Sequence, residues 1–231
     1  MPSEPQHSRL RRQPISSTNP DQEEHPLVLI VDDDERIREA LQELLLSVGI
    51  ESACFASTRE LLDCHLPDRP GCLILDVRMP GSSGLDLQNH LATSGNAKPV
   101  IFLTGHGDIP MTVRAMKAGA IDFLTKPVRD QTLLDAVTAG LARDIAQRAA
   151  AQVVRQHAER FATLTSRERL VLRAVALGRL NKQIAFDLGI SEITVKLHRS
   201  NVMRKMQAGS VGDLIRAWEA LPDHIRQQGL G

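Results

Sequence analysis

The chain has 231 residues, of which 42% are hydrophobic and 24% charged, and its 28 acidic and 28 basic residues give a formal net charge of zero. This length accommodates one large domain or two ordinary ones. No apolar run approaches the ~18 residues of a membrane-spanning helix, and the N-terminus lacks the apolar core of a secretory signal, so we expect a cytoplasmic protein.

Residues 1–25 contain many Pro, Ser and charged side chains, a composition typical of a disordered tail. After this tail, short apolar runs alternate with segments whose apolar residues recur at helical spacing. This alternation predicts right-handed β-α-β units and therefore an α/β domain, a doubly wound parallel sheet covered by helices on both faces. The predicted strands are 27–31, 50–55, 72–75, 99–103 and 121–124. The predicted helices are 35–48, 84–92, 108–118 and one from about 129 onward. A further helix, between the second and third strands, is predicted to begin with a capping box of Ser57 and Glu60.

Reactive polar side chains stand at the carboxyl ends of four of these strands. Ligands of open parallel sheets bind beyond such ends, so we expect the side chains to converge at one edge. Each also has an ordinary alternative, because acids after a strand often cap the next helix and a Lys-Pro pair often lies in a loop. The residues are Asp32 and Asp33 after the first strand, Asp76 after the third, Thr104 after the fourth and Lys126 after the fifth.

Three clustered carboxylates repel one another and raise one another's pKa unless a cation lies among them. Mg²⁺ prefers oxygen ligands and leaves room for water and phosphate. We therefore expect Mg²⁺ to be bound directly by Asp33 and Asp76. Asp32 would act through water or by contacting one of the direct ligands, and the backbone carbonyl of Arg78 would complete the site.

Asp76 ends an apolar run and precedes a Pro/Gly/Ser-rich break, so it could simply begin a turn. Beside a bound cation it is better explained as a nucleophile that forms an aspartyl-phosphate. Mg²⁺ and Lys126 would then neutralise the oxygens of the transferring phosphoryl group, and the hydroxyl of Thr104 would donate to one of them.

The segments "VDDDERIR", "LILDVRMPGSSG", "IFLTGHGDIP" and "DFLTKP" resemble the receiver domain of two-component response regulators, over residues 26–145. The resemblance implies a flavodoxin/CheY-like sheet with strand order 2-1-3-4-5 and phosphorylation of Asp76 by a sensor histidine kinase. It also implies a cis bond between Lys126 and Pro127, and a switch in which Phe123 moves with Thr104.

A third acid, Asp34, follows the pair and departs from the family's pattern. Counted from Val31, the end of the predicted strand, the pair that matches the family's metal-binding acids is Asp32 and Asp33. Phe123 stands where tyrosine is commoner in the family, and taken alone it would be read as a core residue.

The charge pattern changes after the receiver-like part. Residues 26–150 carry 12 basic and 17 acidic residues, a net charge of −5, whereas residues 151–231 carry 13 and 7, a net charge of +6. This asymmetry suggests two domains with different partners, the second partner being a polyanion. Residues 146–160 are rich in Ala, Gln and Arg without Pro or Gly, which predicts a helical linker before a domain at 161–231.

Capping residues predict four helices in this last domain. The first opens with a capping box formed by Thr165 and Glu168 and stops at Gly178. A short helix, a glycine turn and a further helix then make a helix-turn-helix. The remaining predicted boundaries are an N-cap at Asn181 and a stop at Gly189, an N-cap at Ser191 for the helix "EITVKLHRSNVMRKM", and an N-cap at Ser210 for the last helix.

A helical wheel of the third of these helices separates a core side, with Val195, Val202 and Met206, from a basic, mixed side. Such a side suits the major groove of DNA, although helix pairs are common and basic faces are often merely solvated. His198 lies near the core side and is expected to pack there or to contact the DNA backbone, and not to read bases. The candidate DNA-binding residues are Lys182, Ile193, Thr194, Lys196, Leu197, Arg199, Ser200 and Arg204.

The segments "LTSRERLVL" and "NKQIAFDLGISEITVKLHRSNVMRKM" resemble the LuxR-type DNA-binding domain over residues 161–221, and the whole chain is similar to FixJ-type transcriptional response regulators. The resemblance implies a non-enzymatic regulator that only assists its own phosphotransfer and dephosphorylation. It would dimerise when phosphorylated, bind promoter DNA and meet RNA polymerase. The alternative is a phosphorelay module whose last domain contacts a protein. A receiver controlling an enzymatic output is disfavoured, because residues 151–231 lack converging catalytic residues.

Overall fold

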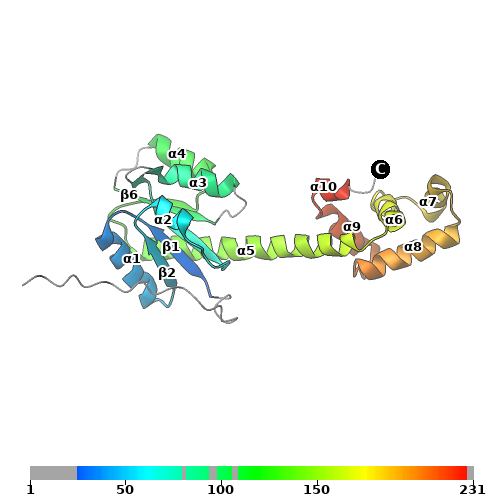
Figure 1. The fold of residues 1–231 in the computed structure, drawn as a ribbon, viewed down its shortest axis with the longest axis horizontal. Coiled ribbons are helices and arrows are strands. Elements are labelled where there is room, and N and C mark those ends of the chain that lie inside the picture. Colours follow the sequence, from blue (N-terminus) through cyan, green and yellow to red (C-terminus); the bar gives the residue numbers. More distant parts are fainter. Residues whose placement is uncertain (1–24, 80–81, 94–97, 106–108, 228–231) are drawn as a thin grey trace, which may run out of the picture. The chain divides into compact units, whose positions relative to one another are not determined.

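The structure is a computed structural model that describes residues 25–79, 82–93, 98–105 and 109–227. Apart from His25, the tail predicted for residues 1–25 lies outside these residues. The chain forms two compact units, Met1–Ile145 and Ala146–Gly231. Figure 1 labels the helices of both. None of the helices in the described ranges is long and apolar enough to cross a membrane.

The first unit is built on a parallel sheet of five strands in the order β2-β1-β3-β6-β7, which is the predicted order when the five are counted along the chain. Every residue of β1, β3 and β6 is buried, because helices cover both faces. The elements are β1 (Leu27–Val31), α1 (Glu35–Ser47), β2 (Glu51–Phe55), α2 (Thr58–Asp63), β3 (Gly71–Asp76), β4 (Arg78–Met79), β5 (Ser82–Ser83), α3 (Gly84–Thr93), β6 (Val100–Thr104), α4 (Ile109–Lys117), β7 (Asp122–Thr125) and α5 (Asp130–Ala162).

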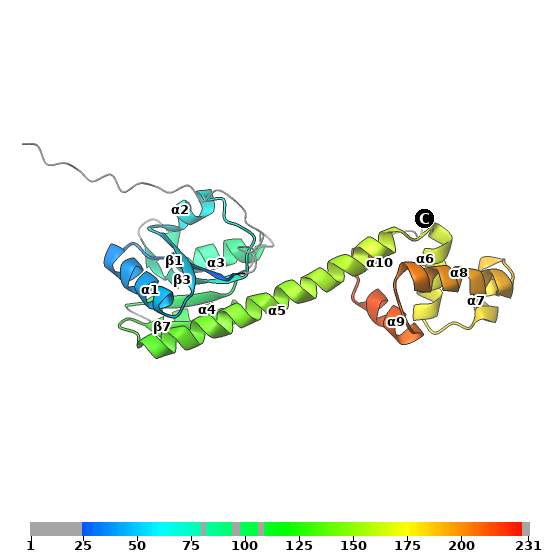
Figure 2. The ribbon, with the colours of Figure 1, turned by 90° about the horizontal axis from the view of Figure 1, so that it is seen from below.

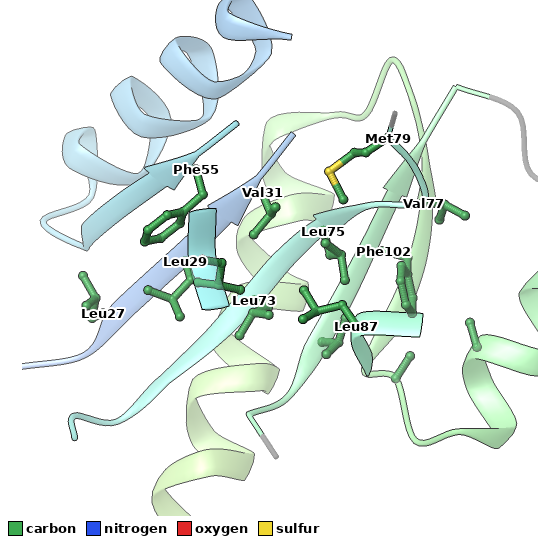
Figure 3. Packing of buried hydrophobic residues seen from close by; sticks show 14 residues of the cluster. Leu27, Leu29, Val31, Phe55, Leu73, Leu75, Val77, Met79, Leu87 and Phe102 are labelled. Atoms are coloured by element: carbon green, nitrogen blue, oxygen red, sulfur yellow. The ribbon is translucent and has the colours of Figure 1, made fainter. Parts of the chain in front are cut away.

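Alternate residues of the strands build two separate apolar layers, one on each face of the sheet. On one face, Leu29, Leu73 and Phe102 pack with side chains of α2, α3 and α4. Figure 3 shows these strand residues together, with Leu87 of α3 among them. On the other face, Ile30 and its neighbours pack with α1 and α5. Figure 2 shows α1 and α5 on the same side of the sheet.

Two local features of the first unit differ from the prediction. The Pro/Gly/Ser break contains two short strands, β4 and β5, which pair antiparallel with each other and stay outside the main sheet. In α2, the hydroxyl of Ser57 accepts the N–H of Glu60 as expected, at 3.1 Å. The Glu60 carboxylate accepts the N–H of Ala56 at 2.7 Å, one residue before the N-cap, so the capping box is only half formed.

The second unit is helical. Its core gathers buried residues of α6, α7, α8 and α9, together with Phe161 from the end of α5. The ring of Trp218 lies 5.9 Å from that of Phe161. The four predicted helices are present, followed by a short fifth one. They are α6 (Ser166–Ala176), α7 (Asn181–Leu188), α8 (Glu192–Lys205), α9 (Val211–Glu219) and α10 (Asp223–Arg226).

Most of the predicted helix ends in this unit are confirmed, and one is wrong. Thr165 and Glu168 form the complete capping box of α6. Asn181, however, is the first residue of α7 and not its N-cap. The cap is Leu180, whose N–H donates to the side-chain oxygen of Gln183 at 2.9 Å, whereas the carboxamide oxygen of Asn181 accepts a hydrogen bond from Arg199.

Candidate functional sites

The three predicted acids converge at the carboxyl edge of the sheet. Asp32 and Asp33 directly follow β1, and Asp76 is the last residue of β3, the strand beside it. Carboxylate oxygens of the three residues all lie within 4.8 Å of one another. Asp32 and Asp76 are 2% and 8% exposed, whereas Asp33 is exposed. The cluster therefore has a buried side toward the sheet and an open side toward solvent.

Lys126 brings a positive charge to the buried side of this cluster. Its ammonium lies 2.5 Å from Oδ2 of Asp32 and 2.8 Å from Oδ2 of Asp76. The peptide bond to Pro127 is cis, as the receiver resemblance implied. Burial by itself would lower the pKa of Lys126, but its hydrogen bonds to the two carboxylates raise that pKa on balance. The ammonium therefore stays charged.

One ammonium does not balance this cluster. Burial raises the pKa of Asp32, and the opposing hydrogen bonds from Lys126 and from the N–H of Asp34 do not restore its usual value. The neighbouring Asp76 carboxylate also raises this pKa, by less than burial does. Three converging carboxylates around one ammonium, with Asp33 facing solvent, fit a divalent cation held by oxygen ligands.

The neighbours of the cluster fix its backbone. Asp34 is the N-cap of α1, and its side chain accepts the N–H of Arg36 at 2.9 Å. The third acid of the run therefore has the ordinary capping role. The guanidinium of Arg38 donates to the carbonyl of Asp32 at 2.7 Å. This contact was not predicted, and the helical position of Arg38 was the only signal that could have indicated it.

The remaining predicted residues of this edge lie close by in the fold. Thr104 is fully buried at the end of β6, and its carbonyl accepts the N–H of Lys126 at 2.8 Å. Phe123 is half-buried, with its ring 6.0 Å from that of Phe102. The N–H of Arg78 donates to Oδ1 of Asp76 at 3.1 Å. The use of the Arg78 carbonyl as a metal ligand stays a prediction.

In the second unit, Gly189 follows the last residue of α7 as its C-cap. Its φ of 64° is the left-handed conformation that commonly ends a helix. The hydroxyl of Ser191 then caps α8. The predicted division of α8 is confirmed: its core-side residues are fully buried, whereas Ile193 and Leu197 are 80% and 61% exposed. The other exposed members of the candidate DNA-binding set are Lys182, Lys196, Ser200 and Arg204.

Two members of that set already have partners inside the unit. The hydroxyl of Thr194 lies 2.9 Å from that of Ser191, and Nη1 of Arg199 donates to the carboxamide oxygen of Asn181 at 2.8 Å. Both residues are half-buried. His198 is half-buried as well, and its buried Nδ1 has no hydrogen-bond partner among the described residues, in line with the expected packing role.

Glu168 has a second role that the capping pattern did not reveal. It is only 4% exposed, and its carboxylate accepts the ammonium of Lys205, at the end of α8, at 2.7 Å. Burial would raise the pKa of Glu168, but the hydrogen bonds from Lys205 and Thr165 lower it on balance. The residue that caps α6 therefore also ties α6 to the helix with the candidate DNA-binding surface.

Comparisons with known proteins agree with this geometry. Residues 28–138 match the response regulator receiver domain, and residues 162–218 match the bacterial regulatory proteins of the luxR family. Nodulation protein W of Bradyrhizobium diazoefficiens is 53% identical, over 84% of this chain and 86% of that protein. Transcriptional regulatory protein FixJ of Azorhizobium caulinodans is 45% identical, over 82% and 90%. The structure of the response regulator StyR superposes with a TM-score of 0.75 at 47% identity, covering 84% of this chain and 98% of that one.

Proposed function

The chain belongs to the FixJ-type response regulators, in which a receiver domain precedes a LuxR-type DNA-binding domain, and from this premise we propose that phosphorylation of Asp76 controls its binding to promoter DNA. It is a two-component transcription regulator and not an enzyme. The observation that carries the proposal is the convergence of three carboxylates and one ammonium at the carboxyl edge of the sheet.

The phosphodonor is the phosphohistidine of a sensor histidine kinase. An Asp76 carboxylate oxygen attacks the phosphorus, the P–N bond breaks, and the imidazole nitrogen leaves with the bonding electron pair and takes up a proton. Asp33 and Asp76 would hold Mg²⁺ directly, with Asp32 behind them and the Arg78 carbonyl completing the site. Bound there, Mg²⁺ supplies positive charge to the transferring oxygens.

Three side chains of the receiver respond to the new charge. Lys126 already contacts Asp76, so its ammonium can pair with a phosphoryl oxygen. The hydroxyl of Thr104 donates to a second oxygen, and Phe123 moves with it. We expect the surface around α4, β7 and α5 to change and to pair two receivers, because two linked DNA-binding domains can then occupy two half-sites.

On DNA, the outward side of α8 enters the major groove. Lys196 and Leu197 contact bases, and Lys182 of α7 contacts a phosphate. Lysine and arginine on an exposed helix face, in a unit with a net positive charge, support this role. The bound dimer would meet RNA polymerase at the promoter. We expect it to act in the cytoplasm, where the kinase's phosphohistidine and the DNA are both within reach.

The test follows phosphorylation from the acid to the DNA. With acetyl phosphate and Mg²⁺, the full chain should gain one acid-stable, base-labile phosphoryl group, sediment as a dimer and bind DNA more tightly. Asp76→Asn should show none of these changes. Asp34→Asn is the matched control, because asparagine caps α1 equally well, and it should behave as wild type. Labelling that persists in Asp76→Asn would overturn the assignment.

A further inference from the structure

Two residues of the helix-turn-helix pair are bonded to each other instead of to the groups that their sequence positions suggested. Asn181 was expected to cap α7, and Arg199 was expected to contact DNA. Their side chains meet at 2.8 Å, which joins the first residue of α7 to the middle of α8 across 18 residues of sequence.

The place of Arg199 on α8 agrees with this partner. It follows Val195 by four residues and precedes Val202 by three, so it lies on the same side of the helix as these two buried residues. Arg199 is half-buried, whereas Lys196 and Arg204 are exposed. The guanidinium therefore lies between α7 and α8, and not in the middle of the exposed side of α8.

Asn181 is followed directly by Lys182, the exposed lysine at the start of α7. A hydrogen bond that holds Asn181 against α8 therefore also fixes where Lys182 stands relative to Lys196. A regulator that contacts bases with α8 and a phosphate with the preceding helix, α7, needs the two helices at a fixed position relative to each other.

We propose that Arg199 is a positioning residue, which acts through Asn181 to hold the phosphate-contacting start of α7 in register with the base-reading side of α8. The proposal rests on the proposed function, in which α8 enters the major groove. It replaces a direct DNA contact of Arg199 by an indirect one, and the two roles differ in a measurable way.

The difference lies in salt dependence and in coupling. An arginine that neutralises a phosphate releases about one counterion, so its loss lowers the salt slope of binding by about one. A positioning residue lowers affinity without changing that slope, and its loss has the same effect as the loss of its uncharged partner. Residues that act as one unit are then non-additive in a double-mutant cycle.

The experiment uses the full chain treated with acetyl phosphate, and a duplex selected from a random pool by the wild-type chain. Arg199→Met and Asn181→Ala should each weaken binding by roughly tenfold, the scale of one hydrogen bond to a charged group. The double variant should be no weaker than either single one, and all three should keep the wild-type salt slope. Lys182→Met is the comparison variant, whose salt slope should fall by about one.

A second measurement needs no DNA. If the contact fixes α7, its amides should exchange with solvent faster in Arg199→Met and Asn181→Ala than in wild type, and at the wild-type rate in Lys182→Met. A salt slope reduced by about one in Arg199→Met, with wild-type binding and exchange in Asn181→Ala, would overturn the proposal. If the wild-type chain selects no sequence from the pool, the proposed function itself fails, whereas the exchange measurement still decides whether the contact fixes α7.

Discussion

The two units carry their candidate sites in opposite ways. In the first unit, the site is assembled from strand ends far apart in the sequence, and Lys126 is bonded to both of the buried acids, Asp32 and Asp76. In the second unit, the candidate DNA-binding side chains lie within two neighbouring helices, and Ile193 is 80% exposed. Removing one partner of a buried ion pair leaves an uncompensated charge and is strongly destabilising, whereas exposed charges are solvated and contribute almost independently. Single changes should therefore be severe in the first unit and graded in the second.

The largest expected effect comes from Asp33, the exposed member of the carboxylate cluster. Asp33→Ala should leave the fold intact, because the residue is exposed, and should remove a direct metal ligand. Changes that merely disturb such ligands cost about 10–100-fold in metal affinity. We expect no detectable Mg²⁺-dependent labelling of Asp76 by acetyl phosphate. Near-normal labelling would mean that the wrong acid was assigned to the metal.

Lys126→Met should show how strongly the buried charges depend on one another. Without metal, two buried carboxylates lose their ammonium, and breaking a buried pair in this way costs about 3 kcal/mol. Saturating Mg²⁺ should restore most of the loss, since a bound cation offsets the same carboxylates. Urea unfolding with and without Mg²⁺ measures both effects. Lys117→Met, at the exposed end of α4, is the control and should change stability by less than about 0.5 kcal/mol.

Glu168→Gln tests the one buried ion pair described here in the second unit. It keeps a side-chain oxygen for the cap and loses the charge that faces Lys205. We expect a loss of about 2 kcal/mol, below the usual cost of breaking a buried pair because Lys205 is partly exposed. In calorimetry, the unfolding temperature of the second unit should fall, and that of the first unit should not change. Glu60→Gln, at the exposed cap of α2, is the matched control and should leave both transitions in place.

Acid should act on the contributions of Glu168 and Asp32 with opposite signs. The pKa of Glu168 is lowered in the folded chain, so its stabilising contribution is present above its unfolded pKa and is lost as the pH falls through the folded value. The pKa of Asp32 is raised, so its own contribution to the stability of the metal-free first unit increases as the pH falls through the folded value. Titrating from about pH 6 to about pH 3 should erase the difference between wild type and Glu168→Gln. In the same titration the stability of Asp32→Asn, relative to wild type, should fall, because that variant lacks the contribution of the Asp32 carboxyl.

The exposed lysines should affect DNA binding and leave the stability of the fold almost unchanged. Lys196→Ala should weaken binding to the selected duplex by about 1–3 kcal/mol and relax its sequence preference. Lys182→Ala should weaken selected and random duplexes alike and lower the salt slope by about one. Both variants should remain folded, because neither side chain enters the core. Unchanged binding in both would place the DNA-contacting surface elsewhere on the unit.

The same contrast explains what the sequence could predict. The edge of the sheet was predictable, because apolar runs mark where strands end and a parallel topology brings those ends together. The outward side of α8 was predictable from helical periodicity alone. Two of the contacts that were missed join side chains distant in the sequence, Lys205 with Glu168 and Arg199 with Asn181. A third joins Arg38 to a backbone carbonyl six residues away.

Local rules failed where a competing partner was available. Asn181 is an ordinary N-cap residue by type, but its carboxamide oxygen accepts from Arg199, and the N-cap of α7 is Leu180. Glu60 reaches Ala56 instead of Ser57, so the carboxylate satisfies a different N–H from the one that the capping-box spacing specifies. Neither choice can be made from spacing, because it depends on which polar group lies nearest in the folded chain.

The packing of Trp218 on Phe161 has a practical consequence. The sequence contains one tryptophan and no tyrosine, so ultraviolet emission from the native chain comes almost wholly from this ring in the second unit. The receiver contains no tryptophan or tyrosine, so it adds almost nothing to this emission, and no substitution or label is needed. A change in emission on adding denaturant or DNA therefore reports on the second unit alone. A change on adding acetyl phosphate means that the event at Asp76 has reached that unit.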